Sequence, residues 1–201
     1  MKSARKKLRI FVPGIVIASF VFLQLTLAAA GPHFTSFGNG KVQVRLYSDY
    51  FCPACRRLEP KIERMIMDLV KRNAITLTLI DTPIHKYSTL YARYFLYALN
   101  NRSDFKYALD SRKVLFNAAK EKIEDSAKLE GFLNTHGIGF REFDVRPVFE
   151  TMSAYLRADR IDTTPTLVIE SDGKKETYQG NSILPAIEEL LTRPVAHKTD
   201  R

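Results

Sequence analysis

Alternating and helical spacings of apolar side chains divide the chain after residue 40 into strands and helices. Residues 42–48 and 74–80 alternate apolar with polar side chains, which is typical of half-buried strands. Between these segments, from Cys52 to about Arg72, apolar residues recur at helical spacing and predict an amphipathic helix. A strand, a helix and a strand in this order predict a right-handed, parallel βαβ unit.

Helical patterns fill the chain from residue 88 to about residue 160. We expect Ser88 to cap the first of four helices and Pro147 to open the fourth, because serine favours caps and proline favours the first helical turn. The aromatic residues of the first helix are expected to belong to the core. The expected helices cover residues 89–100, about 104–119, about 125–136 and 147 to about 160.

The strand pattern returns after these helices. Residues 166–170 and 175–178 flank the turn sequence Ser171-Asp172-Gly173 and predict a hairpin, and a last helix is expected over about 182–191. The sequence therefore predicts an α/β fold with a single sheet. In this fold a helical insertion at about 88–160 separates a βαβ half from a ββα half.

The first 30 residues have the pattern of an export signal. Five cations and no acidic residue precede an apolar stretch, residues 10–27, which is followed by three alanines. We expect cleavage near Ala30, although the stretch is also long enough to remain as an inner-membrane anchor. Both alternatives place the body of the protein outside the cytoplasm, in the periplasm. Residues 31–40 then form a short polar leader, residues 41–192 the domain, and residues 193–201 a polar tail.

The signal accounts for much of the positive charge. The whole chain carries a net charge of +9, and without residues 1–30 it keeps 26 basic and 22 acidic residues, or +4. A charge this small gives no reason to expect a nucleic-acid partner. An exported domain with only two cysteines depends on packing for its stability, which leaves both sulfurs available for chemistry.

Cys52 and Cys55 lie in the sequence Cys52-Pro53-Ala54-Cys55, where the first strand gives way to the first helix. The first sulfur would sit at the helix N-terminus, where unpaired N–H groups and the helix dipole stabilise a thiolate. The second would lie one turn further on, close enough to attack a mixed disulfide formed on the first. The pair therefore predicts thiol–disulfide exchange, with Cys52 as nucleophile and Cys55 as resolving thiol.

Two other interpretations of the cysteine pair stay open. The pair could be half of a zinc site, but such a site needs four ligands and the four histidines are scattered. Two structural cysteines could also fall three residues apart by chance. The histidines are His33, His85, His136 and His197.

Three motifs together resemble the DsbA-like family of thiol–disulfide oxidoreductases, which have a thioredoxin fold. They are the runs Ser48–Cys55, Thr82-Pro83-Ile84-His85 and Thr163-Thr164-Pro165-Thr166, and the resemblance covers most of residues 41–192. It implies that Pro165 is cis and lies against the cysteines, and that Thr164 and Pro165 dock an extended substrate segment. It also implies protein thiols and disulfides as substrates and a redox partner protein, with no cofactor and no metal.

The chain departs from the family pattern at two positions. Close relatives often carry a buried acid six residues before the first cysteine, where this chain has Leu46. The nearest acid, Asp49, is expected to cap the turn, and His85 is likewise expected to be a turn residue. DsbA itself has histidine where this chain has Ala54. The alanine side chain offers neither a charge nor a hydrogen bond to stabilise a thiolate.

These observations predict an exported thiol–disulfide oxidoreductase that acts as a mild disulfide donor. An oxidising compartment favours a donor, and the short leader leaves no room for the dimerisation domain of dimeric isomerases. Ala54 makes the protein a weaker oxidant. It stabilises the Cys52 thiolate less, so the reduced dithiol form is less favoured over the disulfide. The alternatives are a reductase or isomerase, a metallochaperone, and a non-catalytic assembly factor that binds peptides in the groove beside Pro165.

Overall fold

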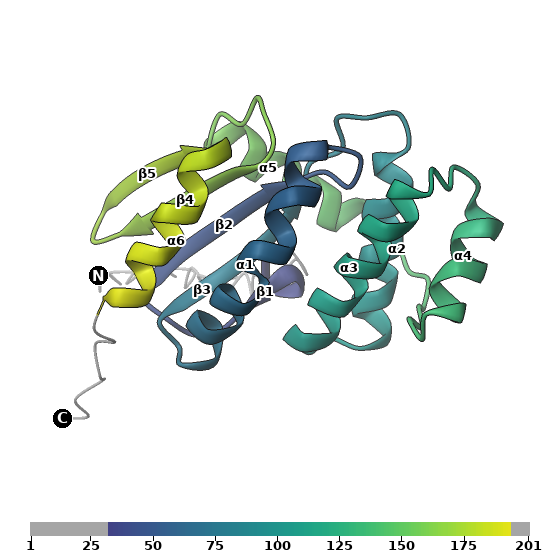
Figure 1. Ribbon diagram of the computed structural model, residues 1–201, viewed down its shortest axis with the longest axis horizontal. Coiled ribbons are helices and arrows are strands. Elements are labelled where there is room, and N and C mark those ends of the chain that lie inside the picture. The colour runs from purple at the N-terminus through teal and green to yellow at the C-terminus, as the bar shows by residue number, and fades with distance from the viewer. Residues whose placement is uncertain (1–31, 194–201) are drawn as a thin grey trace, which may run out of the picture.

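A computed structural model describes residues 32–193, so the expected export signal and most of the expected tail lie outside the described residues (Figure 1). Within that range, five strands form one mixed sheet in the order β1-β3-β2-β4-β5. None of the described helices is both long enough and apolar enough to span a membrane. The strands are β1 (Ser36–Phe37), β2 (Val42–Ser48), β3 (Ile75–Asp81), β4 (Thr166–Ser171) and β5 (Lys174–Gln179).

The central strand β2 pairs with β3 in parallel and with β4 in antiparallel orientation. Leu46 lies opposite Leu79 on one side and Leu167 on the other, and all three side chains are buried. Both neighbours are apolar, which explains why an apolar residue fits at position 46. The expected βαβ unit and the β4–β5 hairpin are confirmed.

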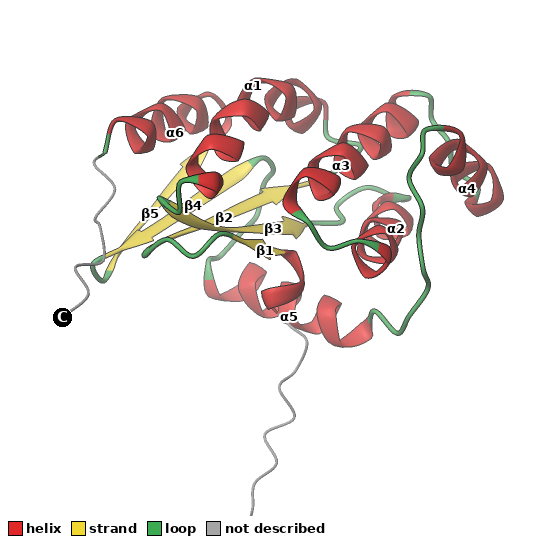
Figure 2. Cartoon of the chain, turned by 90° about the horizontal axis from the view of Figure 1, so that it is seen from below, coloured by secondary structure: helices red, strands yellow, loops and turns green. Residues whose placement is uncertain are grey.

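The helices surround this sheet in distinct groups. In Figure 2, α1 and α6 cover one face of the sheet, α5 lies against the other, and α2, α3 and α4 gather beyond one side. The expected α/β fold with a helical insertion between β3 and β4 is confirmed. The helices are α1 (Pro53–Lys71), α2 (Ser88–Asn101), α3 (Phe105–Lys120), α4 (Ser126–Thr135), α5 (Arg146–Ala158) and α6 (Ile183–Thr192).

Capping distinguishes the helices of the insertion from one another. Asp104 and Asp125 cap α3 and α4, because each carboxylate accepts a backbone N–H three residues on. The expectation that Ser88 caps α2 is wrong: Tyr87 occupies the N-cap position, and the buried Ser88 hydroxyl makes no hydrogen bond. The fourth helix begins at Arg146, one residue earlier than expected.

The segment expected to be a polar leader contributes to the sheet. β1 pairs with β3 through Ser36 opposite Thr78 and Phe37 opposite Leu77. A strand of two residues is too short to leave an alternating pattern, so it could not be predicted from the sequence. The turn after β1 comes so close to the start of β3 that a Cβ on Gly40 would lie 2.3 Å from the Ile75 nitrogen, which requires glycine there.

Asp159, just after α5, ties the inserted helices back to the central strand. Its carboxylate accepts hydrogen bonds from Arg45 Nε at 2.6 Å and from the Tyr47 hydroxyl at 2.6 Å, and Lys175 Nζ adds another at 2.7 Å. Burial alone would raise the pKa of Asp159, but these donors hold it below its ordinary value. The buried charge is thus fully paired with β2 and β5.

Replacement of Asp159 by alanine should lower the free energy of unfolding by about 3 kcal/mol, because Tyr47 would stay buried without its side-chain acceptor and Arg45 would keep only Glu170. Denaturant titration of the wild-type and variant proteins measures this difference. Asp162→Ala is the matched control, since that side chain is exposed and should cost well under about 1 kcal/mol. Equal losses in the two variants would contradict the structural role of Asp159.

Candidate active site

The end of β2 and the start of α1 place the two cysteines. A tight turn follows Ser48, and the Cys52 N–H closes it by donating to the Asp49 carbonyl at 3.1 Å. Cys52 then occupies the N-cap of α1 in an extended conformation, and Pro53 is the first helical residue. The helix therefore begins one residue later than expected. Cys52 lies at its N-terminus, toward which the unpaired N–H groups of the first helical turn point.

The loop before β4 lies against Cys52. The Thr164–Pro165 peptide bond is cis, as expected, and the Cys52 thiol donates a hydrogen bond to the Thr164 carbonyl at 3.3 Å. Residues 112 positions apart in the sequence thus meet in one site. The Cys52 side chain keeps some access to solvent, with 8% of the residue exposed, whereas Cys55 is fully buried.

The two thiols differ in acidity. Burial disfavours the thiolate of Cys52, but hydrogen bonds led by the Cys55 N–H outweigh it, and the pKa of Cys52 lies below the ordinary value. Burial raises the pKa of the Cys55 thiol to about 12, although hydrogen bonds from the Asp49 backbone and the Ser48 side chain act to lower it. Near neutral pH the site therefore holds one reactive thiol and one protonated thiol.

Asp49 organises the loops around the cysteines. Its carboxylate accepts N–H bonds from Phe51 at 2.7 Å and from Ile84 at 2.8 Å, and it lies 3.1 Å from Nδ1 of His85. These contacts fasten the turn before α1 to the loop after β3. The turn roles expected of Asp49 and His85 are both confirmed.

A buried arginine lies among acidic groups close to the site. Arg112 of α3 binds Asp81 at the end of β3 at 2.9 Å and forms an ion pair with Glu59 of α1. Its guanidinium also lies 5.4 Å from the ring centroid of Tyr50, whose hydroxyl donates to Asp81 at 3.2 Å. Burial raises the pKa of Asp81 to about 6, although Arg112 acts to lower it.

Ser48 connects this charged cluster to the deeper cysteine. Its hydroxyl donates to Glu59 Oε1 at 3.3 Å, and its side chain also acts to lower the pKa of the Cys55 thiol. Ser48 thus relates the deeper thiol to a carboxylate on the helix that carries the cysteines, whereas Leu46 offers no acid.

Ser48, Glu59, Asp81 and Arg112 are site residues that were not predicted from the sequence. A signal existed for Glu59, which comes four residues after Cys55 and so lies on the same side of α1. For Arg112 the signal was its position on the apolar face of α3, three or four residues from Leu109, Leu115 and Phe116. Neither signal shows which partner the charge meets.

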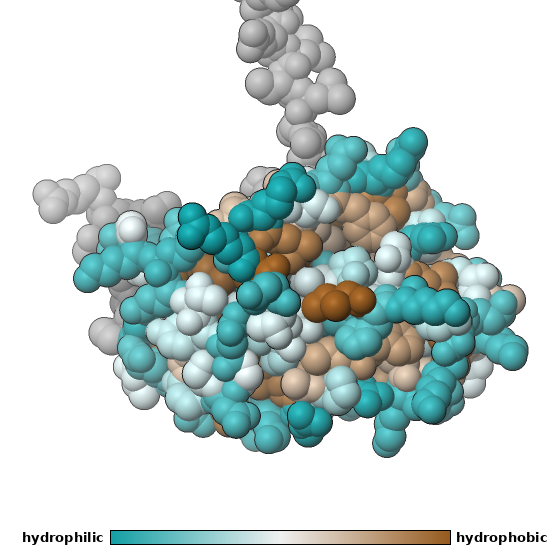
Figure 3. Space-filling model, turned by 90° about the horizontal axis from the view of Figure 1, so that it is seen from above, coloured by the Kyte–Doolittle hydropathy of each residue, from teal (hydrophilic) through white to brown (hydrophobic). Residues whose placement is uncertain are grey.

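Hollows flank the first turns of α1. A cleft of about 630 Å³ opens between α1 and α3, and a groove of about 310 Å³ runs beside Pro165. α1 begins near the top of Figure 1, and Figure 3 looks onto that face, where apolar side chains lie in recesses between projecting polar ones. The groove is lined by Ala54, Arg57, Leu58, Lys61, Pro165, Gly180, Asn181, Leu184 and Pro185.

The metal alternative finds no ligand set in the part of the chain that the structure describes. There, His, Cys, Asp and Glu side chains form no group of three or more that could hold a metal ion. His85, which lies in the loop after β3, is engaged with Asp49.

Comparisons with known proteins give a consistent result. A family model described as thioredoxin matches residues 37–189. Among solved structures, a periplasmic thioredoxin-like protein from Salmonella enterica serovar Typhimurium aligns with a TM-score of 0.60 at 19% identity, covering 83% of this chain and 91% of that one. DsbA2 from Pseudomonas aeruginosa aligns with a TM-score of 0.55 at 18% identity, covering 78% of this chain and 93% of that one.

A third structure, alpha-DsbA1 from Wolbachia pipientis, has a TM-score of 0.59 at 13% identity, covering 78% of this chain and 90% of that one. No curated protein matches the chain. The structural likenesses show a shared fold, and the family model covers most of the chain together with its Cys-Pro-Ala-Cys pair. The chain therefore belongs to the thioredoxin family, and Cys52 and Cys55 lie within the matched residues.

Proposed function

We propose that this protein is exported and exchanges disulfides with other proteins through Cys52 and Cys55, as a mild disulfide donor. The observation that carries the proposal is the unequal state of the two thiols. Cys52 has a lowered pKa and reaches the surface, whereas Cys55 is fully buried with a raised pKa. An entering thiol or disulfide thus meets Cys52 first, and Cys55 is held back to resolve the mixed disulfide.

The donor reaction moves two electrons from substrate to protein. A substrate thiolate attacks the Cys52 sulfur of the disulfide form, so that a substrate–Cys52 bond forms and the Cys52–Cys55 bond breaks. Cys55 leaves as a thiolate and takes up a proton, and a second substrate thiolate then releases Cys52. Two substrate thiols become one disulfide, and a redox partner protein that carries a disulfide must later remove the two electrons from the dithiol.

Ser48 and Glu59 serve as the proton path for Cys55. When Cys55 attacks a mixed disulfide on Cys52, its proton moves to Ser48 Oγ while the Ser48 proton moves to Glu59 Oε1. Glu59 also lines the cleft between α1 and α3, where it can exchange protons with solvent. The same path runs in reverse when Cys55 is the leaving group.

Thr164 and Pro165 dock the substrate. Support comes from the contact of the Thr164 carbonyl with the Cys52 thiol and from the groove beside Pro165, which runs alongside Ala54 and Leu184. A polypeptide in this groove would present its own sulfur to Cys52. A non-catalytic assembly factor would use the same groove, so replacement of both cysteines by serine separates the alternatives: an oxidoreductase loses its activity, and a binding factor keeps it.

The export of the protein and the direction of disulfide exchange are supported by separate observations. The basic and apolar N-terminal segment has the pattern of an export signal or anchor, and one of the similar structures is named as periplasmic. A stabilised Cys52 thiolate favours the dithiol form and hence a donor. Ala54 contributes only its backbone N–H to this stabilisation, which supports a mild donor over a strong one.

The oxidised protein should introduce disulfides into a reduced, unfolded substrate protein. Equilibration with glutathione should place its reduction potential between about −270 mV, the value for thioredoxin, and about −120 mV, the value for DsbA. The variant with serine at both positions 52 and 55 serves as the inactive control. A potential at or below that of thioredoxin, combined with strong disulfide-reducing activity, would establish a reductase instead.

Alkylation of the reduced protein should modify Cys52 first. An ordinary cysteine has a pKa of about 8.5, and its alkylation slows as the pH falls below that value. Because the pKa of Cys52 is lowered, its thiolate persists and its alkylation stays fast to a lower pH. Iodoacetamide kinetics between about pH 4 and pH 10, followed by mass spectrometry, measure the midpoint. Cys52→Ser should resist alkylation until denaturant exposes Cys55. Faster modification of Cys55 in the native protein would reverse the two roles.

Replacement of Ser48 by alanine should slow the step in which Cys55 resolves a mixed disulfide. Loss of the hydroxyl removes a group that lowers the pKa of Cys55, and each unit by which that pKa rises reduces the thiolate fraction about tenfold. Stopped-flow reaction of the reduced protein with an aromatic disulfide separates attack by Cys52 from release by Cys55. The second phase should slow by about tenfold, and by more than the first.

Ser88→Ala is the matched control for this variant. The Ser88 hydroxyl is also buried but makes no hydrogen bond, so its loss should change neither phase. An unchanged second phase in Ser48→Ala would exclude the proton path through Ser48.

A further inference from the structure

The cleft between α1 and α3 is lined by cations that have no carboxylate partner among the described residues. Arg56 and Arg57 extend from the first turns of α1, and Lys113 and Lys120 extend from α3 on the opposite wall. Arg56 is partly exposed and the other three side chains are exposed. Elsewhere on the described surface some cations, such as Arg102, Lys106 and Arg146, pair with nearby carboxylates, and others, such as Lys128 and Lys174, do not, so the cleft is distinguished by the convergence of four cations on one recess.

The carboxylates of the cleft do not balance these four charges. Glu59 is already engaged by the buried Arg112, and Glu63 is the other acidic residue of the lining. Apart from Asn117, the remaining lining is apolar: Pro53 and Pro60 on α1 are exposed, and Leu109 and Phe116 on α3 are almost fully buried. The cleft, about 630 Å³ in volume, therefore carries a net positive charge beside partly apolar walls.

The position of the cleft relates it to the sulfur chemistry. Pro53, which lines it, directly follows Cys52, and Arg57 lines both the cleft and the groove beside Pro165. Lys61 adds a further cation on the groove side. A polypeptide that occupies either hollow while its sulfur reaches Cys52 therefore lies beside these cations.

We infer that the cleft selects thiol substrates in which acidic side chains and an apolar side chain flank the reactive cysteine. This inference rests on the proposed function and adds the class of substrate to it. Carboxylates of the bound segment would pair with the four cations, and an apolar side chain would pack over the exposed rings of Pro53 and Pro60. Charges that converge on a recess accelerate encounter with oppositely charged partners, and salt suppresses this effect.

The test uses the oxidised protein and three unstructured peptides, each with two cysteines and one leucine. They are identical except for three flanking residues, which are glutamate, glutamine or lysine. Flanking charge also changes the acidity of a peptide thiol, so each rate is divided by the rate of the same peptide with bis(2-hydroxyethyl) disulfide, a neutral reagent. We expect the corrected rate of the glutamate peptide to exceed that of the glutamine peptide about tenfold at low salt, and to approach it at about 0.5 M salt.

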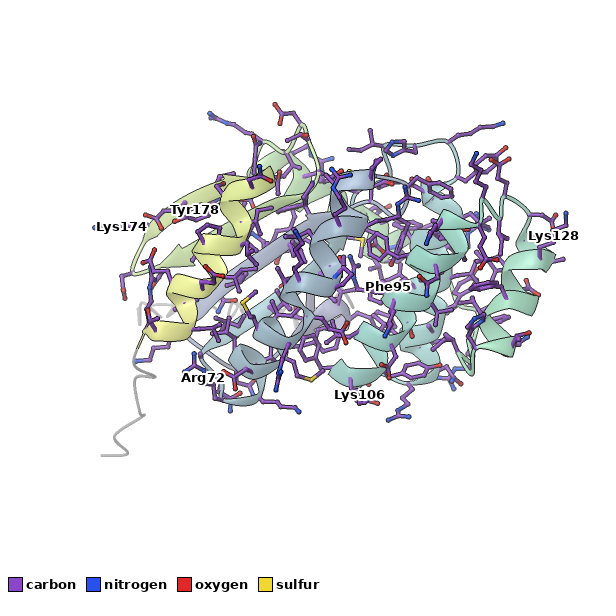
Figure 4. The ribbon with its side chains drawn as sticks, in the orientation of Figure 1. Arg72, Phe95, Lys106, Lys128, Lys174 and Tyr178 are labelled. Carbon is purple, nitrogen blue, oxygen red and sulfur yellow. The ribbon has the colours of Figure 1, made fainter. Side chains whose placement is uncertain are left out.

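Two double variants of equal charge show whether the cleft is responsible. Lys113→Gln with Lys120→Gln removes the cations of the α3 wall and should lower the glutamate-to-glutamine ratio about threefold or more. Lys128→Gln with Lys174→Gln removes the same charge from exposed positions at opposite ends of the molecule, where Figure 4 labels both residues. This control pair should leave the ratio unchanged.

The outcomes separate this inference from the proposed function. Equal corrected rates for the three peptides, or equal effects of the two double variants, would overturn the acidic preference and leave thiol–disulfide exchange intact. If none of the peptides is oxidised, the donor function fails and the preference fails with it. A glutamate preference that is lost in the cleft variant and kept in the control variant supports the inference.

Discussion

The buried guanidinium of Arg112 constrains the arrangement of the whole site. A cation removed from water needs facing carboxylates, and here they come from two other elements, Glu59 on α1 and Asp81 at the end of β3. Because the two carboxylates come from different elements and both pair with the same guanidinium, the inserted helix α3, the cysteine-bearing helix α1 and the sheet are tied to one another through Arg112. The aromatic rings of Tyr50, Phe95 and Phe116 around the guanidinium enclose the cluster.

The unequal thiols follow from this arrangement. Cys52 lies at the N-terminal end of α1, where backbone N–H groups favour its thiolate. In the thiol form, Cys52 donates a hydrogen bond to the Thr164 carbonyl. Cys55 lies one turn deeper, where burial outweighs the hydrogen bonds that reach it. Ser48 then relates the deeper sulfur to Glu59, a carboxylate of the same cluster, whereas Leu46 offers no acid.

Prediction from the sequence succeeded where the pattern is local. The strands, the helices and the C-P-A-C turn were recognisable because each has its own spacing of apolar side chains or its own start signal, and the observed bounds differ from the expected ones by at most about two residues. Errors arose where tertiary contacts decide. Ser88 looked like a helix cap but is buried without a hydrogen bond, and Ser36 and Phe37 form an edge strand too short to produce a pattern.

The sequence by itself determined the order of the elements, the thioredoxin fold and the residues of the Cys52–Cys55 and Thr164–Pro165 motifs, because local spacing and motif identity are properties of neighbouring positions. Only the tertiary structure decided what surrounds them. Arg112 meets Glu59 across 53 positions, and Cys52 meets Thr164 across 112. The acidity of a thiol and the pairing of a buried charge depend on such distant neighbours, since both are set by burial and by the charges and donors within a few ångströms.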